Sequence, residues 1–228
     1  MSRHLETELE QLKRKLLSLS TIVEEVVQKS VDAVANHNEI LAREVIRSDE
    51  IIDDREVELE EDCLKILALH QPVAIDLRFV ILALKMNNDL ERIGDLSVNM
   101  AERTLFLSKY KHVPVPFDFK KMADMTRSML RDAIDSLIKM DAQIAHQVCT
   151  SDDEVDKINR EMYVTAFRLV KEQPEHVEAF MNYISVSRHL ERIADYATNI
   201  AEDVIYMIEG TIVRHSPEEI GHRSNHKK

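Results

Sequence analysis

The fold is decided by a stretch of sequence that occurs twice, as LERIGDLSVNMAE at residues 90–102 and as LERIADYATNIAE at residues 190–202. The surrounding windows, 84–103 and 184–203, are identical at 8 of 20 positions. Similarity at a fixed interval is typical of an internal repeat, in which each copy forms one structural unit. The sequence therefore predicts two related halves.

Both halves have the apolar spacing of helices. Leu5, Leu9, Leu12, Leu16 and Leu19, for example, follow one another at intervals of three and four residues, which is the pattern of an amphipathic helix. Composition points the same way, because 3 glycines, 5 prolines and 5% aromatic residues in a chain of 228 are too few for a sheet protein with many turns. We therefore predict an all-α fold.

Breaks in the pattern divide each half into three main helices. The first half is predicted to form helices at about 5–35, 49–69 and 73–107, with a short helical turn at about 40–46 and an N-terminal cap at Ser48-Asp49. The second half is predicted to form a helix at about 120–140, a short segment at about 142–149, a helix capped near Ser151-Asp152, and a last helix that follows a break at Gln173-Pro174 and ends at about 213. We expect six main helices in two tandem, duplicated, antiparallel three-helix bundles.

A connector that contains prolines separates the two halves. Residues 109–118 include Pro114 and Pro116, neither of which fits the interior of a helix. We assign a first bundle to residues 1–112, a linker to 113–118 and a second bundle to 119–213. Residues 214–228, which are rich in His, Lys and Glu, are expected to form a disordered tail.

Charge and cysteine content exclude several classes of protein. A formal net charge of -12 opposes nucleic-acid binding, which depends on Lys and Arg displacing counterions from phosphates. Cys63 and Cys149 lie in different halves and form no CxxC or Cys/His pattern of a zinc or redox site. No apolar run reaches the roughly 20 residues that cross a bilayer, and no signal peptide follows Met1. We expect a cytoplasmic protein.

The repeated stretch aligns acidic and amide side chains on one face of a helix. At about 100° per residue, Asp95, Asn99 and Glu102 fall within about 80° of Glu91. The same arithmetic places Asp195, Asn199 and Glu202 on the face of Glu191 in the second copy. The preceding helix of each half adds two aspartates at i and i+4. Each half thus has an acidic stripe that can hold a metal: Asp49, Asp53, Glu91, Asp95 and Asn99 in the first, and Asp152, Asp156, Glu191, Asp195 and Asn199 in the second.

These stripes need a positive counter-charge. Like charges at i and i+4 destabilise a helix by about a few tenths of a kcal/mol per pair. Arg92 and Arg192 can supply the charge, which would make each stripe a solvated face with surface ion pairs. A bound cation can supply it as well, and carboxylate and amide oxygens favour hard metals such as iron(III), manganese, magnesium or calcium. The Glu-x-x-His spacing of di-iron oxidases occurs only from Glu219 to His222, which argues against an oxidase.

Several of these residues together resemble the PhoU family of phosphate-regulation proteins. The resemblance rests on Asp76-Leu77-Arg78, Lys85, the stretch 89–95 with Asn99, and the weaker copy at 190–199, and it extends from the first helix to about Ile212. It implies two similar three-helix bundles side by side, with E(D)xxxD motifs that hold multinuclear iron or other metals on the bundle surface.

The resemblance also implies which residues bind the metal. By this resemblance the ligands are Glu91, Asp95, Glu191 and Asp195, with Asp49, Asp53, Asp152 and Asp156 contributing from the adjacent helices. Asn99 and Asn199 are candidates because they lie on the same helix faces. Iron is the metal expected, with zinc, manganese and magnesium as alternatives. The second copy departs from the first at His189 in place of Asp89 and at Ala194 in place of Gly94.

What the resemblance implies about function is regulation rather than catalysis. Proteins of this family act as negative regulators of phosphate uptake and of the phosphate-starvation response, and they contact the ATPase of the phosphate ABC transporter and a sensor histidine kinase. By resemblance we expect a metal-binding helical adaptor, peripheral to the membrane through its partners and without catalytic residues. A homodimer is expected because long bundles leave apolar edges. Two alternatives stay open: a carboxylate-bridged metalloenzyme, for which the sequence offers no base or nucleophile beside the stripes, and a metal-free helical scaffold.

Overall fold

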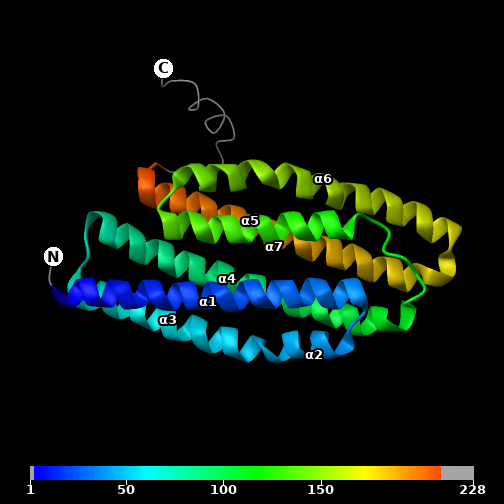
Figure 1. The fold of residues 1–228 in the computed structure, drawn as a ribbon, viewed down its shortest axis with the longest axis horizontal. Coiled ribbons are helices and arrows are strands. Elements are labelled where there is room, and N and C mark those ends of the chain that lie inside the picture. Colours follow the sequence, from blue (N-terminus) through cyan, green and yellow to red (C-terminus); the bar gives the residue numbers. More distant parts are fainter. Residues whose placement is uncertain (1–2, 212–228) are drawn as a thin grey trace, which may run out of the picture.

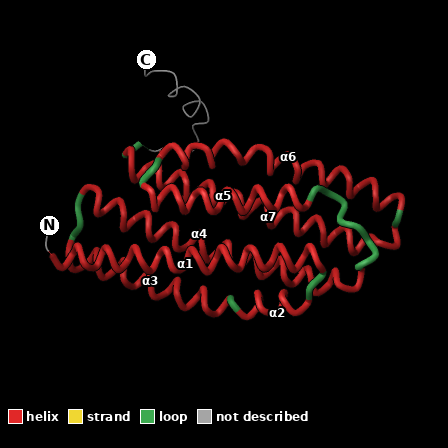
Figure 2. The backbone as a smooth tube through the Cα atoms, viewed as in Figure 1, coloured by secondary structure: helices red, strands yellow, loops and turns green. Residues whose placement is uncertain are grey.

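The computed structural model describes residues 3–211 as an array of long helices (Figure 1). The helices are α1 (Arg3–Asn36), α2 (Glu39–Arg47), α3 (Asp49–His70), α4 (Ala74–Leu107), α5 (Phe119–Lys139), α6 (Ala142–Glu172) and α7 (Val177–Glu209), with short 3-10 segments at Ser108–Tyr110 and Pro174–His176. These residues contain no strand (Figure 2), so the all-α prediction is confirmed. None of the helices in this range combines the length and the apolar content that crossing a membrane requires. The predicted tail at 214–228 lies outside the described residues.

The helices form two antiparallel three-helix bundles that lie side by side. The first consists of α1, the pair α2–α3, and α4, and the second consists of α5, α6 and α7 (Figure 1). Between the bundles, α4 packs against α7, which runs in the opposite direction, and α1 packs against α5. The two copies of the repeated stretch therefore lie on adjacent helices.

Apolar side chains fill both bundles and the boundary between them. In α1, Leu12, Leu16 and Leu19 are at most 1% exposed, as their helical spacing predicts. Leu90 and its repeat counterpart Leu190 are fully buried. Each such leucine contributes about 1.5–3 kcal/mol by leaving water. The apolar side of the repeated stretch thus faces the core, which leaves its acidic side on the outer face of α4 and α7.

The helix boundaries differ from the prediction in the second half. There the predicted short segment and the capped helix are one continuous helix, α6, and the Ser151 hydroxyl donates to the carbonyl of Gln147 at 2.9 Å. Ser48 does separate α2 from α3, yet its hydroxyl donates to the carbonyl of Val45 and caps nothing. A serine can bond back to a preceding helical carbonyl as well as cap a new helix. The boundary predicted at Ser48-Asp49 is therefore correct but lacks the side-chain cap, and the boundary predicted at Ser151-Asp152 is wrong. The last helix ends at Glu209 with Gly210 in the left-handed conformation at φ 71°, before the predicted end at 213.

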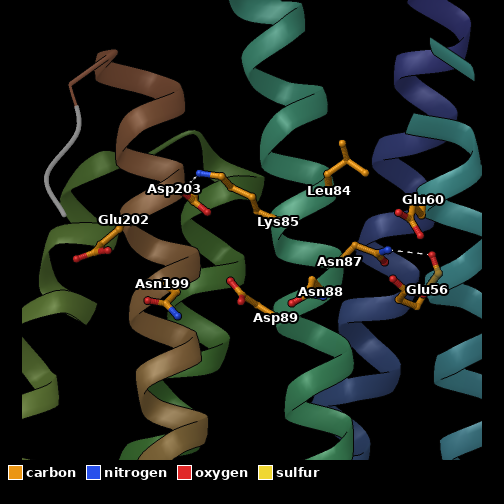
Figure 3. A pocket seen from close by; sticks show the side chains of 10 residues that line it. All are labelled: Glu56, Glu60, Leu84, Lys85, Asn87, Asn88, Asp89, Asn199, Glu202 and Asp203. Carbon is orange, nitrogen blue, oxygen red and sulfur yellow. Dashed lines mark hydrogen bonds and ion pairs between the residues drawn. The ribbon is translucent and has the colours of Figure 1, made fainter. Parts of the chain in front are cut away.

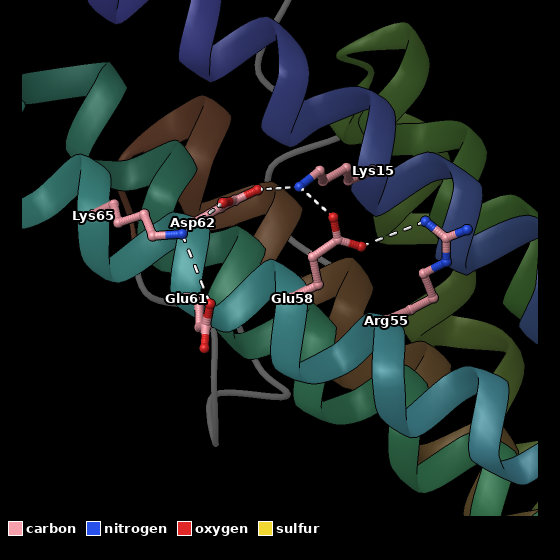
Figure 4. A network of polar contacts seen from close by, with 6 residues as sticks. All are labelled: Lys15, Arg55, Glu58, Glu61, Asp62 and Lys65. Atoms are coloured by element: carbon pink, nitrogen blue, oxygen red, sulfur yellow. Dashed lines mark hydrogen bonds and ion pairs between the residues drawn. The ribbon is translucent and has the colours of Figure 1, made fainter.

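An ion-pair network joins α3 to α1 (Figure 4). Lys15 of α1 pairs with Glu58 at 2.8 Å and with Asp62, and Arg55 also reaches Glu58, at 3.5 Å. Lys65 joins the network through Glu61 and Asp62, each at 3.7 Å. Exposed pairs of this kind contribute little stability, about 0–1 kcal/mol each. They neutralise Glu58, Glu61 and Asp62 of α3, whereas within residues 3–211 no lysine pairs with Asp49, Asp53, Glu56 or Glu60 of the same helix.

Candidate metal centre

Three aspartates of the second half converge between α6 and α7. Asp152 and Asp156 on α6 and Asp195 on α7 each offer a carboxylate oxygen, and these oxygens lie within 4.8 Å of one another. We call them the aspartate trio. Elsewhere in residues 3–211, no other three His, Cys, Asp or Glu side chains come this close. Carboxylate oxygens at such separations form a donor set for a hard cation.

The electrostatics show that the aspartate trio is short of positive charge. Burial raises the pKa of the Asp152 carboxyl to about 7, with further contributions from Asp195 and Asp156. Burial and Asp156 also raise the pKa of Asp195. One oxygen of Asp152 is buried without a hydrogen-bond partner among the described residues. The counter-charges are Arg160, an exposed residue that donates to Asp156 at 3.1 Å, and Arg192, whose charge lowers the pKa of Asp195. A cation among these oxygens would relieve the repulsion that shifts their pKa values.

The remaining predicted residues of the second half lie around the trio rather than in it. Glu191 is half-buried, and its pKa is raised by burial and then by Asp195 and Asp156, while Arg188 and Arg192 act to lower it. Its carboxyl is thus within reach of the charges of the trio and of these two arginines. Asn199 instead lines a groove between α4 and α7, and among the described residues no hydrogen bond joins it to the trio (Figure 3).

In the first half an arginine takes the place that a cation could fill. Arg92 pairs with Glu91 at 3.3 Å and with Asp95 at 3.2 Å. Burial raises the pKa of Asp49, as do the charges of Asp53 and Asp95, so the acids of α3 and α4 do face one another. The predicted stripe is therefore present but already has a partner.

Asn99, the last predicted residue of the first half, donates its side-chain amide to the backbone carbonyl of Asp95 at 2.9 Å. Its carboxamide thus folds back onto its own helix.

Close packing at Gly94 brings the two acidic helices of the first half together. A Cβ at Gly94 would lie 2.9 Å from Cδ1 of Ile52, a buried residue of α3 that is located between Asp49 and Asp53. In the second half Ala194 replaces the glycine, and Val155, one methylene smaller, occupies the repeat position of Ile52. The second half thus has the larger residue on the last helix and the smaller one on the preceding helix.

A groove of about 640 Å³ between the bundles was not predicted from the sequence (Figure 3). Its lining consists of Glu56 and Glu60 of α3, Leu84, Lys85, Asn87, Asn88 and Asp89 of α4, and Asn199, Glu202 and Asp203 of α7. Across it, Lys85 pairs at 3.0 Å with Asp203, which is only 4% exposed. One sequence feature could have indicated this groove: the residue after the repeated Ala-Glu is Arg103 in the first half and Asp203 in the second.

His189, which replaces Asp89 in the second copy, lies in a cationic environment. Burial lowers its pKa to about 4, and Arg103, Arg192 and Arg188 lower it further in the same direction. The imidazole is therefore neutral at pH 7. The two ends of the α4–α7 contact accordingly differ in charge.

Comparisons with known proteins identify the family. The PhoU domain model matches twice, at residues 16–104 and 119–204. The phosphate-specific transport system accessory protein PhoU homolog 1 of Thermotoga maritima is 36% identical over 211 residues, which cover 91% of this chain and 90% of that one. The PhoU homolog of Pseudomonas aeruginosa is 36% identical over 220 residues, covering 94% of this chain and 89% of that protein.

Solved structures agree with these sequence matches. The crystal structure of PhoU from Pseudomonas aeruginosa has a TM-score of 0.87 at 33% identity and covers 90% of this chain and 99% of its own. That of the phosphate transport system regulatory protein PhoU from Streptococcus pneumoniae has a TM-score of 0.81 at 28% identity, covering 92% and 99%. With two domain matches and relatives aligned along almost its whole length, the chain belongs to the PhoU family.

Proposed function

We propose that this protein is an accessory regulator of phosphate-specific transport, and that it acts as a negative regulator of phosphate uptake and of the phosphate-starvation response. The proposal is supported by the names of relatives that match about nine tenths of the chain. It is also supported by structural neighbours, each aligned over 99% of its own chain. The chain is not proposed to be an enzyme, because the family to which it belongs is one of accessory proteins.

The proposed mechanism depends on a metal cation held on the bundle surface. The observation that carries it is the aspartate trio, whose three carboxylates lie within 4.8 Å of one another. Asp152, Asp156 and Asp195 would hold the cation with help from Glu191. Iron is the metal proposed, with zinc, manganese and magnesium as alternatives, since all are accepted by carboxylate oxygens. Asp49, Asp53, Glu91 and Asp95 form a second, weaker site.

Metal binding would act through the charge of the surface. A cation removes negative charge from the face formed by α6 and α7, and so changes the affinity of that face for another protein. The effect on a partner can be no larger than the difference in affinity for the partner's two states. The partners proposed are the ATPase of the phosphate ABC transporter and a sensor histidine kinase, contacted in the cytoplasm by a homodimeric adaptor that reaches the membrane through them.

A pull-down of the transporter ATPase tests this mechanism. We expect capture by the metal-loaded protein to differ at least severalfold from capture by the chelator-treated protein, and the double variant Asp152→Asn/Asp195→Asn to behave as metal-free in both conditions. Asp54→Asn, which removes an exposed aspartate of α3 outside the aspartate trio, is the matched control. Capture that is indifferent to metal, to phosphate and to the double variant would contradict the mechanism.

A metal-free helical scaffold is the second candidate. The ion pairs of Arg92 with Glu91 and Asp95 favour it, because they show that a protein side chain can supply the counter-charge of a stripe. Elemental analysis of the purified protein separates the candidates: a metal content below one ion per chain after purification without chelator supports the scaffold. Turnover of phosphate esters by the metal-loaded protein would instead support a carboxylate-bridged metalloenzyme.

A further inference from the structure

The groove between the bundles contains a buried side-chain oxygen without a hydrogen-bond partner among residues 3–211. Asn87 of α4 lines this groove and is 1% exposed. Its amide nitrogen donates to the backbone carbonyl of Glu56 at 2.9 Å (Figure 3). Its carboxamide oxygen, Oδ1, is buried and accepts no hydrogen bond from the described part of the chain. Buried oxygens are usually paired, so Asn87 points to a donor that these residues do not provide.

Two carboxylates of α3 accompany this oxygen in the lining of the groove. Glu56 and Glu60 are one turn apart, and in Figure 3 both side chains extend from α3 towards Asn87. Glu56 is half-buried and Glu60 is exposed. Burial raises the pKa of Glu56, and the charges of Glu60 and Asp53 raise it further, while Arg92 acts to lower it. Within residues 3–211, neither glutamate forms an ion pair with a lysine or an arginine.

The repeat counterpart of this arrangement is closed by a hydrogen bond within the protein. Asn159 and Ser187 occupy the repeat positions of Glu56 and Asn87. The Ser187 hydroxyl donates to Oδ1 of Asn159 at 2.8 Å, and both residues are buried. A tyrosine, Tyr163, replaces the second carboxylate. The same helix contact is thus built with neutral, paired groups in the second half, so folding does not require an open oxygen beside two carboxylates.

The rest of the groove is also rich in negative charge. Asp89 on α4 and Glu202 and Asp203 on α7 add three carboxylates to its lining. Among the described residues that line it, Lys85 alone carries a positive charge, and Asp203 balances this charge at 3.0 Å. A volume of about 640 Å³ falls in the range of about 300–1,000 Å³ that is typical of small-molecule sites. The groove therefore has room for an extended organic cation.

We propose that this groove binds a linear aliphatic polyamine, and that Asn87, Glu56 and Glu60 hold one of its primary ammonium groups. A protonated primary amine has three N–H donors and no acceptor. The three side chains offer it one acceptor each, and the two carboxylates make hydrogen bonds that are charge-assisted. The remaining amines of the ligand extend towards the carboxylates of α7. The aspartate trio contributes no side chain to the groove, so the inference is independent of the metal centre.

Calorimetric titration of the full-length chain with spermidine tests the proposal. The protein is first freed of metal with a chelator, which is then removed, and the ionic strength is held constant. We expect saturable binding of spermidine by this metal-free protein. Loss of a charge-assisted hydrogen bond corresponds to a factor of about ten or more in affinity, so Glu60→Gln should weaken binding about tenfold. Glu50→Gln removes the same charge from an exposed position of α3 outside the groove and should leave binding unchanged.

A double variant transfers the closed arrangement of the second half into the first. Glu56→Asn combined with Asn87→Ser reproduces the hydrogen-bonded pair of Asn159 and Ser187. This variant should fold, because the second half already uses the pair at the same helix contact, and thermal unfolding checks that it does. It removes one carboxylate and the open oxygen together, so it should weaken spermidine binding about a hundredfold or more.

Three results would overturn the proposal: no saturable binding of spermidine, equal weakening by Glu50→Gln and Glu60→Gln, or tight binding that the folded double variant retains. A peptide of three lysines, used as a second titrant, distinguishes the source of the amine. Tighter binding of spermidine supports a free polyamine as the ligand. Tighter binding of the peptide would overturn that choice in favour of a lysine-rich segment of another protein.

Discussion

At the scale of single residues, burial of the Asp152 carboxyl carries an electrostatic cost. Its folded-state pKa of about 7 lies above the ordinary value of 3.8 because of burial and the neighbouring aspartates. Below about pH 4 the carboxyl is protonated in the folded and the unfolded state, so burial of a charge costs no stability. That stability is lost as the pH rises through about 7, where the buried carboxyl of the folded protein ionises. Asp152→Asn, which is never charged, should therefore stabilise the metal-free protein by about 1 kcal/mol at pH 8, allowing for solvent screening, and have little effect at pH 4.

Urea unfolding at the two pH values, in the presence of chelator, measures this difference. Asp54→Asn should show no such dependence on pH, because Asp54 lies outside the aspartate trio. A lower stability of Asp152→Asn at pH 8 would show that the Asp152 carboxylate is stabilised by a partner.

Gly94 and Ile52 should be energetically coupled. An alanine at 94 places its Cβ 2.9 Å from Cδ1 of Ile52, and overpacking of this kind costs about 1–3 kcal/mol. Ile52→Val removes the methyl group that meets the new Cβ, as Val155 does beside Ala194. Chemical unfolding of both single variants and the double variant should give a favourable coupling of about 1 kcal/mol. Additive effects would mean that Ile52 avoids the Cβ by changing rotamer.

At the scale of helices, Asp141 fixes where α6 begins. Its side chain accepts hydrogen bonds from the backbone N–H groups of Gln143, at 2.8 Å, and Ile144, at 3.4 Å. Asp141→Ala should lower the free energy of unfolding by about 1 kcal/mol, since those N–H groups lose their acceptor. Asp153→Ala, a change at an exposed position inside the same helix, should cost less than Asp141→Ala. Equal effects of the two variants in urea unfolding would contradict the role of the cap.

Helical periodicity predicts most of the elements but not their junctions. The spacing of Leu12, Leu16 and Leu19 is enough to define the buried face of α1. A serine before two acids, in contrast, reads the same at Ser48, where α2 and α3 separate, and at Ser151, where α6 continues. Only the packing of α6 along α7 decides between the two outcomes, and packing is not encoded in a local sequence pattern.

The acidic stripes show a similar limit. Which acids share a face of one helix follows from 3.6 residues per turn, so the pairs at i and i+4 were predictable. Whether acids from two helices meet depends on rotamers and on the distance between the helices, which Gly94 and Ile52 help to set. The pairing of Arg92 with Glu91 and Asp95, and the placing of Asn199 in the groove, are properties of that three-dimensional arrangement.

At the scale of the whole molecule, the proposed metal should stabilise the fold. A cation at about 100 times its dissociation constant adds about 2.7 kcal/mol to stability, or about 5–10 °C in Tm for a chain of this size. Thermal scans of chelator-treated protein with and without iron or manganese measure the shift, which Asp195→Asn should reduce and Asp54→Asn should retain. Identical Tm values with metal and with chelator would show that no cation binds the folded state preferentially.

Arg92 makes direct ion pairs with Glu91 and Asp95 in one bundle, whereas its counterpart Arg192 acts on Glu191 and Asp195 of the other without a direct ion pair among the described residues. This difference affects how the protein would respond to rising metal concentration. A cation must displace the two ion pairs of Arg92 to enter one bundle, and only the exposed ion pair of Arg160 with Asp156 to enter the other. Loading would then occur in two steps, and the molecule would have an intermediate state with one half filled. A duplicated domain whose halves saturate at different metal concentrations can respond over a wider range of metal concentration than two identical halves. Arg92→Gln should merge the two loading steps into one.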